Sequence, residues 1–260
     1  MKKKRSLIII LSIIAFIVLF VVLSSTIFCL KNVELNFLSN TINLTGQNEQ
    51  ILESAEIKYN KSIFFADKKQ YTKNLEEKNP YIKIINIETL FPNTIRINAV
   101  ERNELLCVKG FSDNAFKSFM IMDDELKVLK TEKEFVNKKT NAIFVNFEDE
   151  NLTFVEAGQV FLDETKTNLL KKLTTELLAY NNNVVLLKAN FEEITFNFSS
   201  QDDLKIKMRS GTEIVLENIS TKFTEKFMLG LSTYDSVENK SSSKITVYEN
   251  NEGKVVGYYY

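Results

Sequence analysis

The chain begins with a long uninterrupted apolar run. No charged residue occurs between Leu7 and Leu30, and most side chains in this run are apolar. At about 1.5 Å of rise per residue, a helix over the run is roughly 36 Å long, enough to cross a hydrocarbon core of ~30 Å. The pattern predicts a transmembrane helix over residues 7–30. The alternative is a cleaved signal peptide, whose apolar region is typically only about 7–15 residues long.

The charges on either side of this run predict its orientation. Four cations, Lys2 to Arg5, precede the apolar residues, and a single Lys31 follows them. Because cytoplasmic flanks carry the excess of Lys and Arg, we expect residues 1–6 to be a cytoplasmic tail. The rest of the chain is then extracytoplasmic, at the cell membrane.

Residues 31–103 have the periodicities of a small β-α-α-β-β domain. Alternation of apolar and polar residues predicts three strands, at Val33–Leu38, at Tyr81–Leu90 with a bulge at Ile85, and from Ile95 to Arg102. Helical spacing predicts two helices, at Asn48–Ile57 and at Lys68–Lys78. Asp67 is a suitable N-cap for the second helix, and Pro80 ends it by restricting the residue before it.

Residues 104–249 are predicted to form a mainly antiparallel β domain with two helices. Runs flanking turn residues predict two hairpins, Ala115–Met122 with Leu126–Leu129 and Leu204–Met208 with Thr212–Leu216. Apolar stripes predict the two helices, one around Leu169–Leu178 and one around Phe223–Leu231. A strand follows at Lys244–Glu249, and residues 250–260 form a last strand or tail.

Charge and cysteine content limit the possible functions. Four of the 33 basic residues precede the apolar run and all 34 acidic residues follow it, so the remainder carries a net charge of about −5. That balance disfavours nucleic-acid binding, which needs a basic face. Cys29 and Cys107 are the two cysteines, and Cys29 lies inside the predicted span, so we expect no stabilising disulfide.

The sequence lacks the residues of common catalytic sites. It contains no histidine, which removes histidine bases and histidine-ligated metal sites. Its seven glycines form neither G-x-G-x-x-G nor a Walker loop. Ser241 to Lys244 spells S-x-x-K, but K-T-G is absent and the stretch has the composition of a loop. We therefore predict no enzyme, no catalytic residue, no cofactor and no metal.

One stretch resembles a known family. Pro80 ends the second helix, Phe91-Pro92-Asn93-Thr94 forms the turn between two strands, and Glu101-Arg102 ends the returning strand. This pattern resembles the FtsQ/DivIB family of bacterial cell-division proteins, which combine a transmembrane helix, a POTRA domain and a β domain. The family usually has Pro two residues after Glu-Arg, where this chain has Glu104. The resemblance implies that residues 31–103 are the POTRA domain.

The resemblance also implies a function. It implies a non-enzymatic divisome scaffold at the septum that binds DivIC/FtsB-type and FtsL-type single-pass coiled-coil proteins and helps govern septal wall synthesis. The implied partner contact is the strand Lys244, Ile245, Thr246, Val247, Tyr248 and Glu249, which could offer an exposed edge to a partner segment. The face near Ile63–Phe65 is a second candidate, for recruitment, although we expect its aromatic residues to be core. The alternatives are a POTRA-containing secretion or assembly factor, or another membrane-anchored extracytoplasmic binding protein.

Overall fold

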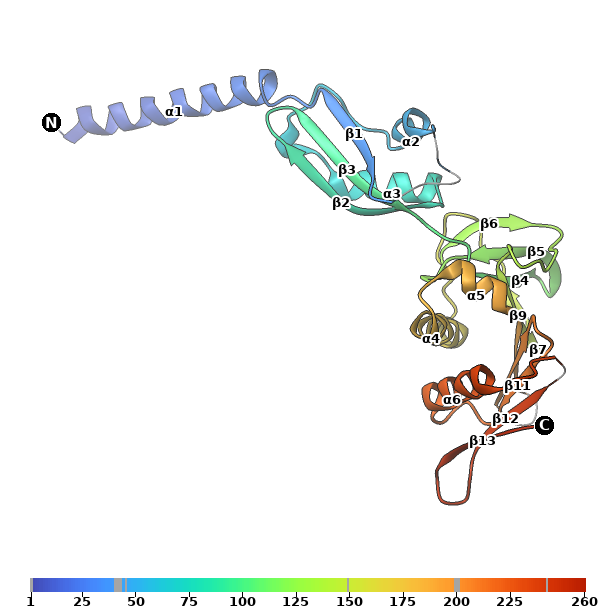
Figure 1. The fold of residues 1–260 in the computed structure, drawn as a ribbon. Coiled ribbons are helices and arrows are strands. Elements are labelled where there is room, and N and C mark those ends of the chain that lie inside the picture. The colour runs from blue at the N-terminus through green and yellow to red at the C-terminus, as the bar shows by residue number, and fades with distance from the viewer. Residues whose placement is uncertain (1, 40–43, 45, 149, 199–201, 242) are drawn as a thin grey trace. The chain divides into compact units, whose positions relative to one another are not determined.

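The chain forms two compact units, Met1–Arg102 and Asn103–Tyr260 (Figure 1). The computed structural model describes residues 2–39, 44, 46–148, 150–198, 202–241 and 243–260; the side chains of residues 2–8, 24 and 164 lie outside this description. Both units combine helices with a β-sheet, so the α+β class is confirmed.

The first unit opens with a single long helix, α1 (Lys2–Thr26). Its described apolar side chains between Ile9 and Val22 are 45–71% exposed. Within the part of the chain that the structure describes, no helix meets the length and hydropathy of a membrane span. The span predicted at residues 7–30 therefore stays a prediction.

The rest of the first unit has the predicted β-α-α-β-β order. Its elements are β1 (Asn32–Phe37), α2 (Asn48–Ser54), the 3₁₀ turn η1 (Ile63–Phe65), α3 (Lys68–Lys78), β2 (Ile82–Leu90) and β3 (Thr94–Glu101). The strands form a sheet in the order β1-β3-β2, with β1 parallel and β2 antiparallel to β3. The β2–β3 register shifts between Ile84 and Asn86, where the offset of Ile85 predicted a bulge.

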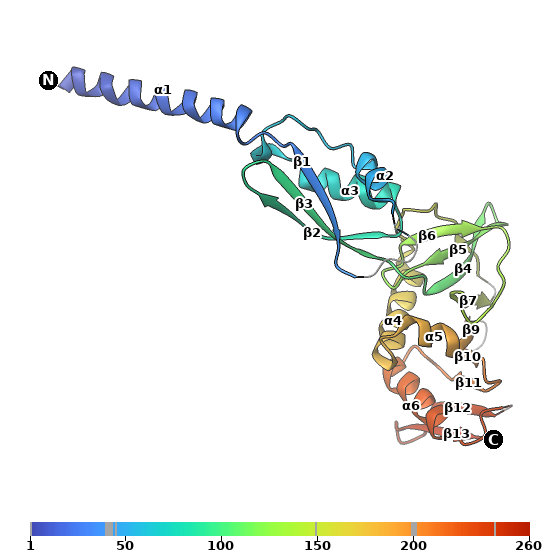
Figure 2. The same ribbon diagram turned by 45° about the horizontal axis from the view of Figure 1, so that its top comes forward.

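Helices α2 and α3 cover one face of this sheet (Figure 2). Alternate residues of β3, among them Ile95 and Ile97, are fully buried with Leu75 of α3. The side chain of Asp67 caps α3 by accepting a hydrogen bond of 3.1 Å from the backbone N–H of Gln70. The predicted cap of α3 and the predicted returning strand are both confirmed.

The second unit contains ten strands and three helices within the described residues. The strands are β4 (Leu106–Ser112), β5 (Ala115–Met122), β6 (Val128–Glu132), β7 (Ile143–Glu148), β8 (Leu152–Thr153), β9 (Phe191–Asn197), β10 (Asp203–Met208), β11 (Glu213–Leu216), β12 (Lys244–Glu249) and β13 (Val255–Tyr259). The helices are α4 (Glu164–Tyr180), α5 (Val184–Asn190) and α6 (Phe223–Ser236). The sequence predicts α4 and α6 but not α5, because α5 is only two turns long and lacks a clear apolar stripe.

These strands form one sheet in the order β13-β12-β11-β10-β9-β7-β4-β5-β6, with β8 beside the end of β4. Antiparallel pairs are in the majority, as predicted, but the sheet is mixed. Strands β4 and β7, β4 and β8, β7 and β9, and β11 and β12 pair in parallel. Parallel neighbours need long crossovers, and here α4 with α5 joins β8 to β9 while α6 joins β11 to β12.

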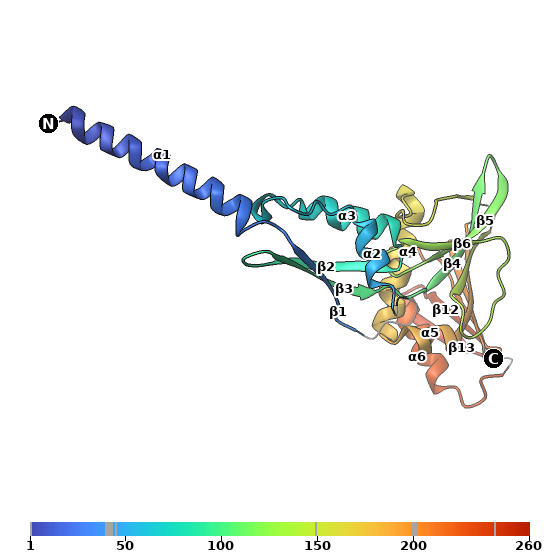
Figure 3. The ribbon, with the colours of Figure 1, turned by 90° about the horizontal axis from the view of Figure 1, so that it is seen from above.

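The three helices lie on one face of the sheet and enclose the main core (Figure 3). Leu170, Leu173 and Leu177 of α4 and Phe223, Phe227 and Leu231 of α6 are all at most 1% exposed. The predicted apolar stripes of both helices are therefore confirmed as core. A smaller cluster around Cys107 and Ile121 lies under Phe135 and Phe144.

Candidate partner-binding edge of the second unit

The strand predicted to offer an open edge lies inside the sheet. Strand β12 pairs in parallel with β11 on one side and antiparallel with β13 on the other. Its central residues Ile245 and Val247 are fully buried. The expectation of an exposed edge at Lys244–Glu249 is therefore wrong. The apolar alternation of this strand reflects burial against the core, and the residues after it form another strand.

The open edge belongs to β13, which ends the sheet. Lys244 and Tyr260 exchange backbone hydrogen bonds of 3.3 and 2.9 Å, and the N–H of Asn250 donates one of 2.9 Å to the carbonyl of Lys254. Because hydrogen-bonded pairs alternate with non-hydrogen-bonded pairs in an antiparallel ladder, the intervening residues of β13 direct their backbone groups away from β12. These residues are Val255, Gly257 and Tyr259, and their outward N–H and C=O groups are called the β13 edge below. Among the described strands, none pairs with it.

Helix α6 covers the core face of these last strands. A Cβ atom built on Gly257 would lie 3.5 Å from Thr233 Oγ1 and 3.7 Å from Leu229 Cγ of α6, which is ordinary contact. At Gly230 the approach is closer, because a Cβ there would lie 3.0 Å from Ile214 Cγ2. The helix therefore supports β12 and β13 from behind and leaves the β13 edge open.

Tyrosines gather on the opposite face of the same strands. The rings of Tyr248 and Tyr258 stack with centroids 5.8 Å apart and planes 10° from parallel. A hydrogen bond with Tyr258 raises the pKa of Tyr248 above the ordinary phenol value. Tyr258 and Tyr260 on this face are 52% and 79% exposed, and Tyr259, which points to the other face beside Gly257, is 66% exposed. Exposed tyrosines of this kind are typical of protein interfaces, because a broad apolar ring carries a polar hydroxyl.

An ion pair fastens the turn between β12 and β13. Lys222, the N-cap of α6, lies 3.1 Å from Glu249 Oε1 and also donates a hydrogen bond to the carbonyl of Gly253. The hydrogen bond from Lys222 holds the pKa of the Glu249 carboxyl below its usual range. This contact ties the hairpin to the start of the supporting helix.

The residues of the family-like stretch have structural positions in the first unit. Pro80 follows Asn79, the C-cap of α3. Phe91, Pro92 and Asn93 form the turn between β2 and β3, with a cis Phe91–Pro92 peptide, and Thr94 begins β3. Glu101 ends β3 and pairs with Ile82 of β2.

Arg102 links β3 to α3. Arg102 Nη2 lies 3.2 Å from Glu76 Oε2 on α3, and its Nε donates to the carbonyl of Ile82. Arg102 is only 8% exposed. It therefore links the end of β3 to the helix that packs on the sheet, and Glu104 beyond it pairs with Lys130 at 3.0 Å.

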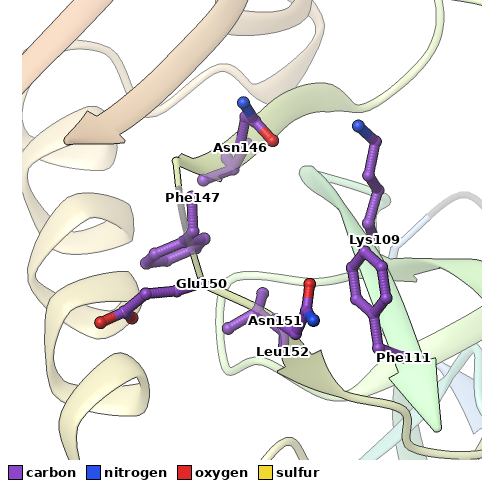
Figure 4. Close-up of a pocket in the computed structure, with 8 residues that line it drawn as sticks. Lys109, Phe111, Asn146, Phe147, Glu150, Asn151 and Leu152 are labelled. Atoms are coloured by element: carbon purple, nitrogen blue, oxygen red, sulfur yellow. The ribbon is translucent and has the colours of Figure 1, made fainter. Parts of the chain in front are cut away.

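A hollow opens where the sheet changes partners (Figure 4). Strand β4 pairs with β7 up to Val108 and with β8 from Gly110 onward, which leaves a cavity of about 330 Å³ between them. Among the described residues that line it, the titratable side chains are Lys109 and Glu150, and Glu150 lies 2.9 Å from Lys166 of α4. One lysine and one ion-paired carboxylate do not make an acid–base pair. The S-x-x-K stretch includes Ser242, which lies outside the described residues.

Comparison with known proteins gives the same family as the sequence pattern. The family model for the FtsQ-type POTRA domain matches residues 40–102. The chain is 26% identical over 246 residues to the cell division protein DivIB of Clostridium botulinum, covering 92% of this chain and 82% of that protein. It is 23% identical over 199 residues to the protein of the same name from Clostridium acetobutylicum, covering 71% and 75%. The matches agree with the pattern from Pro80 to Arg102 and support the FtsQ/DivIB family.

Proposed function

We propose that the chain is a non-enzymatic cell-division scaffold that binds other single-pass division proteins outside the membrane. The observation that carries the proposal is the β13 edge, where Val255, Gly257 and Tyr259 present outward backbone groups beside exposed tyrosines. A partner segment that adds as a further strand would satisfy these groups and pack on the tyrosines. The similarity to proteins named cell division protein DivIB supports a role in cell division.

The proposed partners are DivIC/FtsB-type and FtsL-type coiled-coil proteins, and the proposed consequence of binding is control of septal wall synthesis. Residues 244–249 contribute to the proposed binding surface through the face of β12 that points away from the core. Thr246 and Tyr248 point to the same side as Tyr258, since Thr246 pairs directly with Tyr258 in the ladder. Ile245 and Val247 point into the core, where they support the strand.

We further propose that α1 anchors the chain in the cell membrane, with residues 1–6 in the cytoplasm and both units outside. The support is the uncharged run over residues 7–30 and the cations before it. In this arrangement residues 31–103 are the POTRA domain, 104–249 the body of the β domain and 250–260 its last hairpin strand. The protein would be concentrated at the septum.

The test distinguishes loss of the β13 edge from loss of the fold. In Gly257→Pro the outward N–H is lost, whereas the ladder with β12 does not use it. In the matched control Gly257→Ala the N–H is retained, and the added Cβ lies at ordinary contact distances from Thr233 and Leu229. Both variants, tagged at the N-terminus, are purified from gently solubilised membranes, and co-purifying proteins are identified by mass spectrometry.

We expect the parent chain and Gly257→Ala to retain small single-pass coiled-coil proteins and Gly257→Pro to lose them, with equal thermal unfolding midpoints for all three. Equal recovery with Gly257→Pro would place the contact elsewhere. Recovery of secretion components alone would favour the secretion or assembly alternative. Val247 is unsuitable for this test, because it is fully buried and its substitution would measure folding.

A further inference from the structure

Four phenylalanines meet where α1 enters the first unit. Phe20 and Phe28 come from α1 and the residues after it, Phe64 from η1, and Phe91 from the β2–β3 turn; these four residues are called the phenylalanine cluster below. Ring centroids are 6.0 Å apart for Phe20 and Phe64, 5.2 Å for Phe28 and Phe64, and 5.5 Å for Phe64 and Phe91. Figure 1 shows the β2–β3 turn at the end of the unit where α1 joins it.

The backbone fixes this cluster to the end of the helix. The N–H of Ile63 donates to the carbonyl of Phe28 at 2.8 Å, and the N–H of Leu30 donates to the carbonyl of Lys61 at 2.8 Å. On the other side, the N–H of Lys31 donates to the carbonyl of Asn93 at 2.9 Å. The segment after α1 is therefore bonded to both loops that supply the cluster, and Phe64 and Phe91 have a fixed depth relative to α1.

Phe64 lies beside a part of α1 well before its C-terminal end. Phe20 precedes the end of α1 at Thr26 by about 9 Å, at about 1.5 Å per residue, and the ring of Phe64 contacts Phe20. An environment that surrounds the last turns of α1 therefore also surrounds Phe64.

The phenylalanines at this position were expected to be core, and the structure corrects this expectation. Ile63 is buried at 2%, but Phe64 is 45% exposed, Phe65 is 79% exposed and Phe91 is 60% exposed. These three rings carry no polar group. Phe64 contacts both Phe91 and Phe20 of α1, and Phe65 follows Phe64 in η1. Contiguous exposed apolar patches of this kind mark protein or membrane contact sites.

We propose that Phe64, Phe65 and Phe91 insert into the outer leaflet of the membrane and form a second, non-helical contact between the POTRA unit and the lipid. The occupant is lipid because Phe64 lies against Phe20, which belongs to the exposed apolar surface of α1. Exposed Lys31 and Lys61 lie in the two segments that fix the cluster, where they can meet anionic headgroups. The inference rests on the proposed anchor, since it takes the position of the membrane from α1.

The absence of tryptophan from the chain makes this depth measurable. Full-length Phe64→Trp and Phe91→Trp are each reconstituted in liposomes that contain lipids brominated near the headgroup end of their acyl chains. Phe16→Trp, in the middle of α1, reports the anchor with more deeply brominated lipids. Phe116→Trp is the matched control, because Phe116 is an exposed ring of similar accessibility, 44%, on β5 of the second unit.

We expect bromine quenching and blue-shifted emission for Phe64→Trp and Phe91→Trp, and neither for Phe116→Trp. The result does not depend on which way the protein inserts, because both leaflets carry the quencher. Quenching of Phe16→Trp without quenching at positions 64 and 91 would leave the anchor intact and overturn the inserted patch. Loss of quenching at Phe16→Trp as well would refute the anchor itself. If Phe64→Trp misfolds by circular dichroism, Phe65→Trp replaces it, because Phe65 is more exposed and less constrained by packing.

Discussion

Each unit contains a buried cation, and the two are stabilised differently. Arg102 in the first unit meets the carboxylate of Glu76 at 3.2 Å. Lys226 in the second unit, in the Glu225-Lys226 pair of α6, is fully buried and donates to uncharged oxygens. Its Nζ lies 3.0 Å from the carbonyl of Glu217, 2.7 Å from that of Asn218 and 3.3 Å from Thr221 Oγ1. Burial lowers the pKa of Lys226.

The difference shows two ways in which a buried positive charge can connect neighbouring elements of a fold. Arg102 joins the end of a strand to a helix, whereas Lys226 organises the loop that follows β11 by gathering its carbonyls. Neither side chain is available to a partner. Arg102 and Lys226 therefore have structural roles within their units, whereas the surfaces proposed for binding consist of tyrosines and phenylalanines.

The largest expected effect is that of removing the arginine. Arg102→Ala leaves Glu76, whose side chain is 20% exposed, without its buried cation. Breaking a buried pair from one side costs about 3–5 kcal/mol, so we expect a loss near the lower end of this range in the free energy of unfolding. Urea denaturation of the full chain in detergent, followed by circular dichroism, measures it.

Arg96→Ala is the control, because Arg96 lies on β3, the strand that ends just before Arg102, and also pairs with a glutamate. Its partner Glu34 and Arg96 itself are 51% and 40% exposed, and exposed pairs contribute only about 0.2–1 kcal/mol. Similar losses in both variants would mean that burial does not distinguish the two pairs.

A smaller effect is expected for the lysine. Lys226→Met keeps the volume of the buried stem but leaves the carbonyls of Glu217 and Asn218 without their donor. Unsatisfied buried acceptors cost about 1–3 kcal/mol, so the unfolding midpoint should fall by less than in Arg102→Ala. Lys222→Met, four residues earlier and at the surface, should change the midpoint least. A stabilised Lys226→Met would show that burying the charge costs more than the loop gains from it.

The smallest effect is expected for Lys222, which has a carboxylate partner, Glu249, but lies at the surface. Lys222→Met removes the hydrogen bond that lowers the pKa of Glu249, so this pKa should rise toward its ordinary value. A carboxyl whose folded pKa is depressed contributes stability above its unfolded pKa and loses it as the pH falls through the folded value. Carbon-13 NMR titration of the side-chain carboxyl measures the shift. Lys254→Met, which removes the partner of Glu252, should leave the titration of Glu249 unchanged.

Local patterns predicted most elements of the first unit. The cap at Asp67, the end of α3 before Pro80 and the bulge near Ile85 each follow from a property of one or two neighbouring residues. The pairing of β1 with β3 in parallel could not be read from the sequence, because alternation predicts a strand but not its neighbour.

The candidate site was harder to predict for the same reason. Alternation in Lys244–Glu249 predicted the strand correctly, but whether it forms an edge depends on β13, which packs against it after a short turn. In the first unit, an Ile-Phe-Phe sequence has the same composition whether its rings are buried or exposed. Only the 3₁₀ turn, which buries Ile63 and turns Phe64 and Phe65 outward, decides between them.

The short, hydrogen-bonded segment between α1 and β1 has a mechanical consequence. Any pull along α1 first loads the bonds from Leu30 to Lys61 and from Lys31 to Asn93. It then reaches the parallel ladder in which Asn32 to Phe37 of β1 face Thr94 to Ala99 of β3. A ladder pulled along its strands is loaded in shear, so its hydrogen bonds share the force instead of opening one after another. Tension on the helix is thus carried into the fold by backbone pairing, with no slack segment between them.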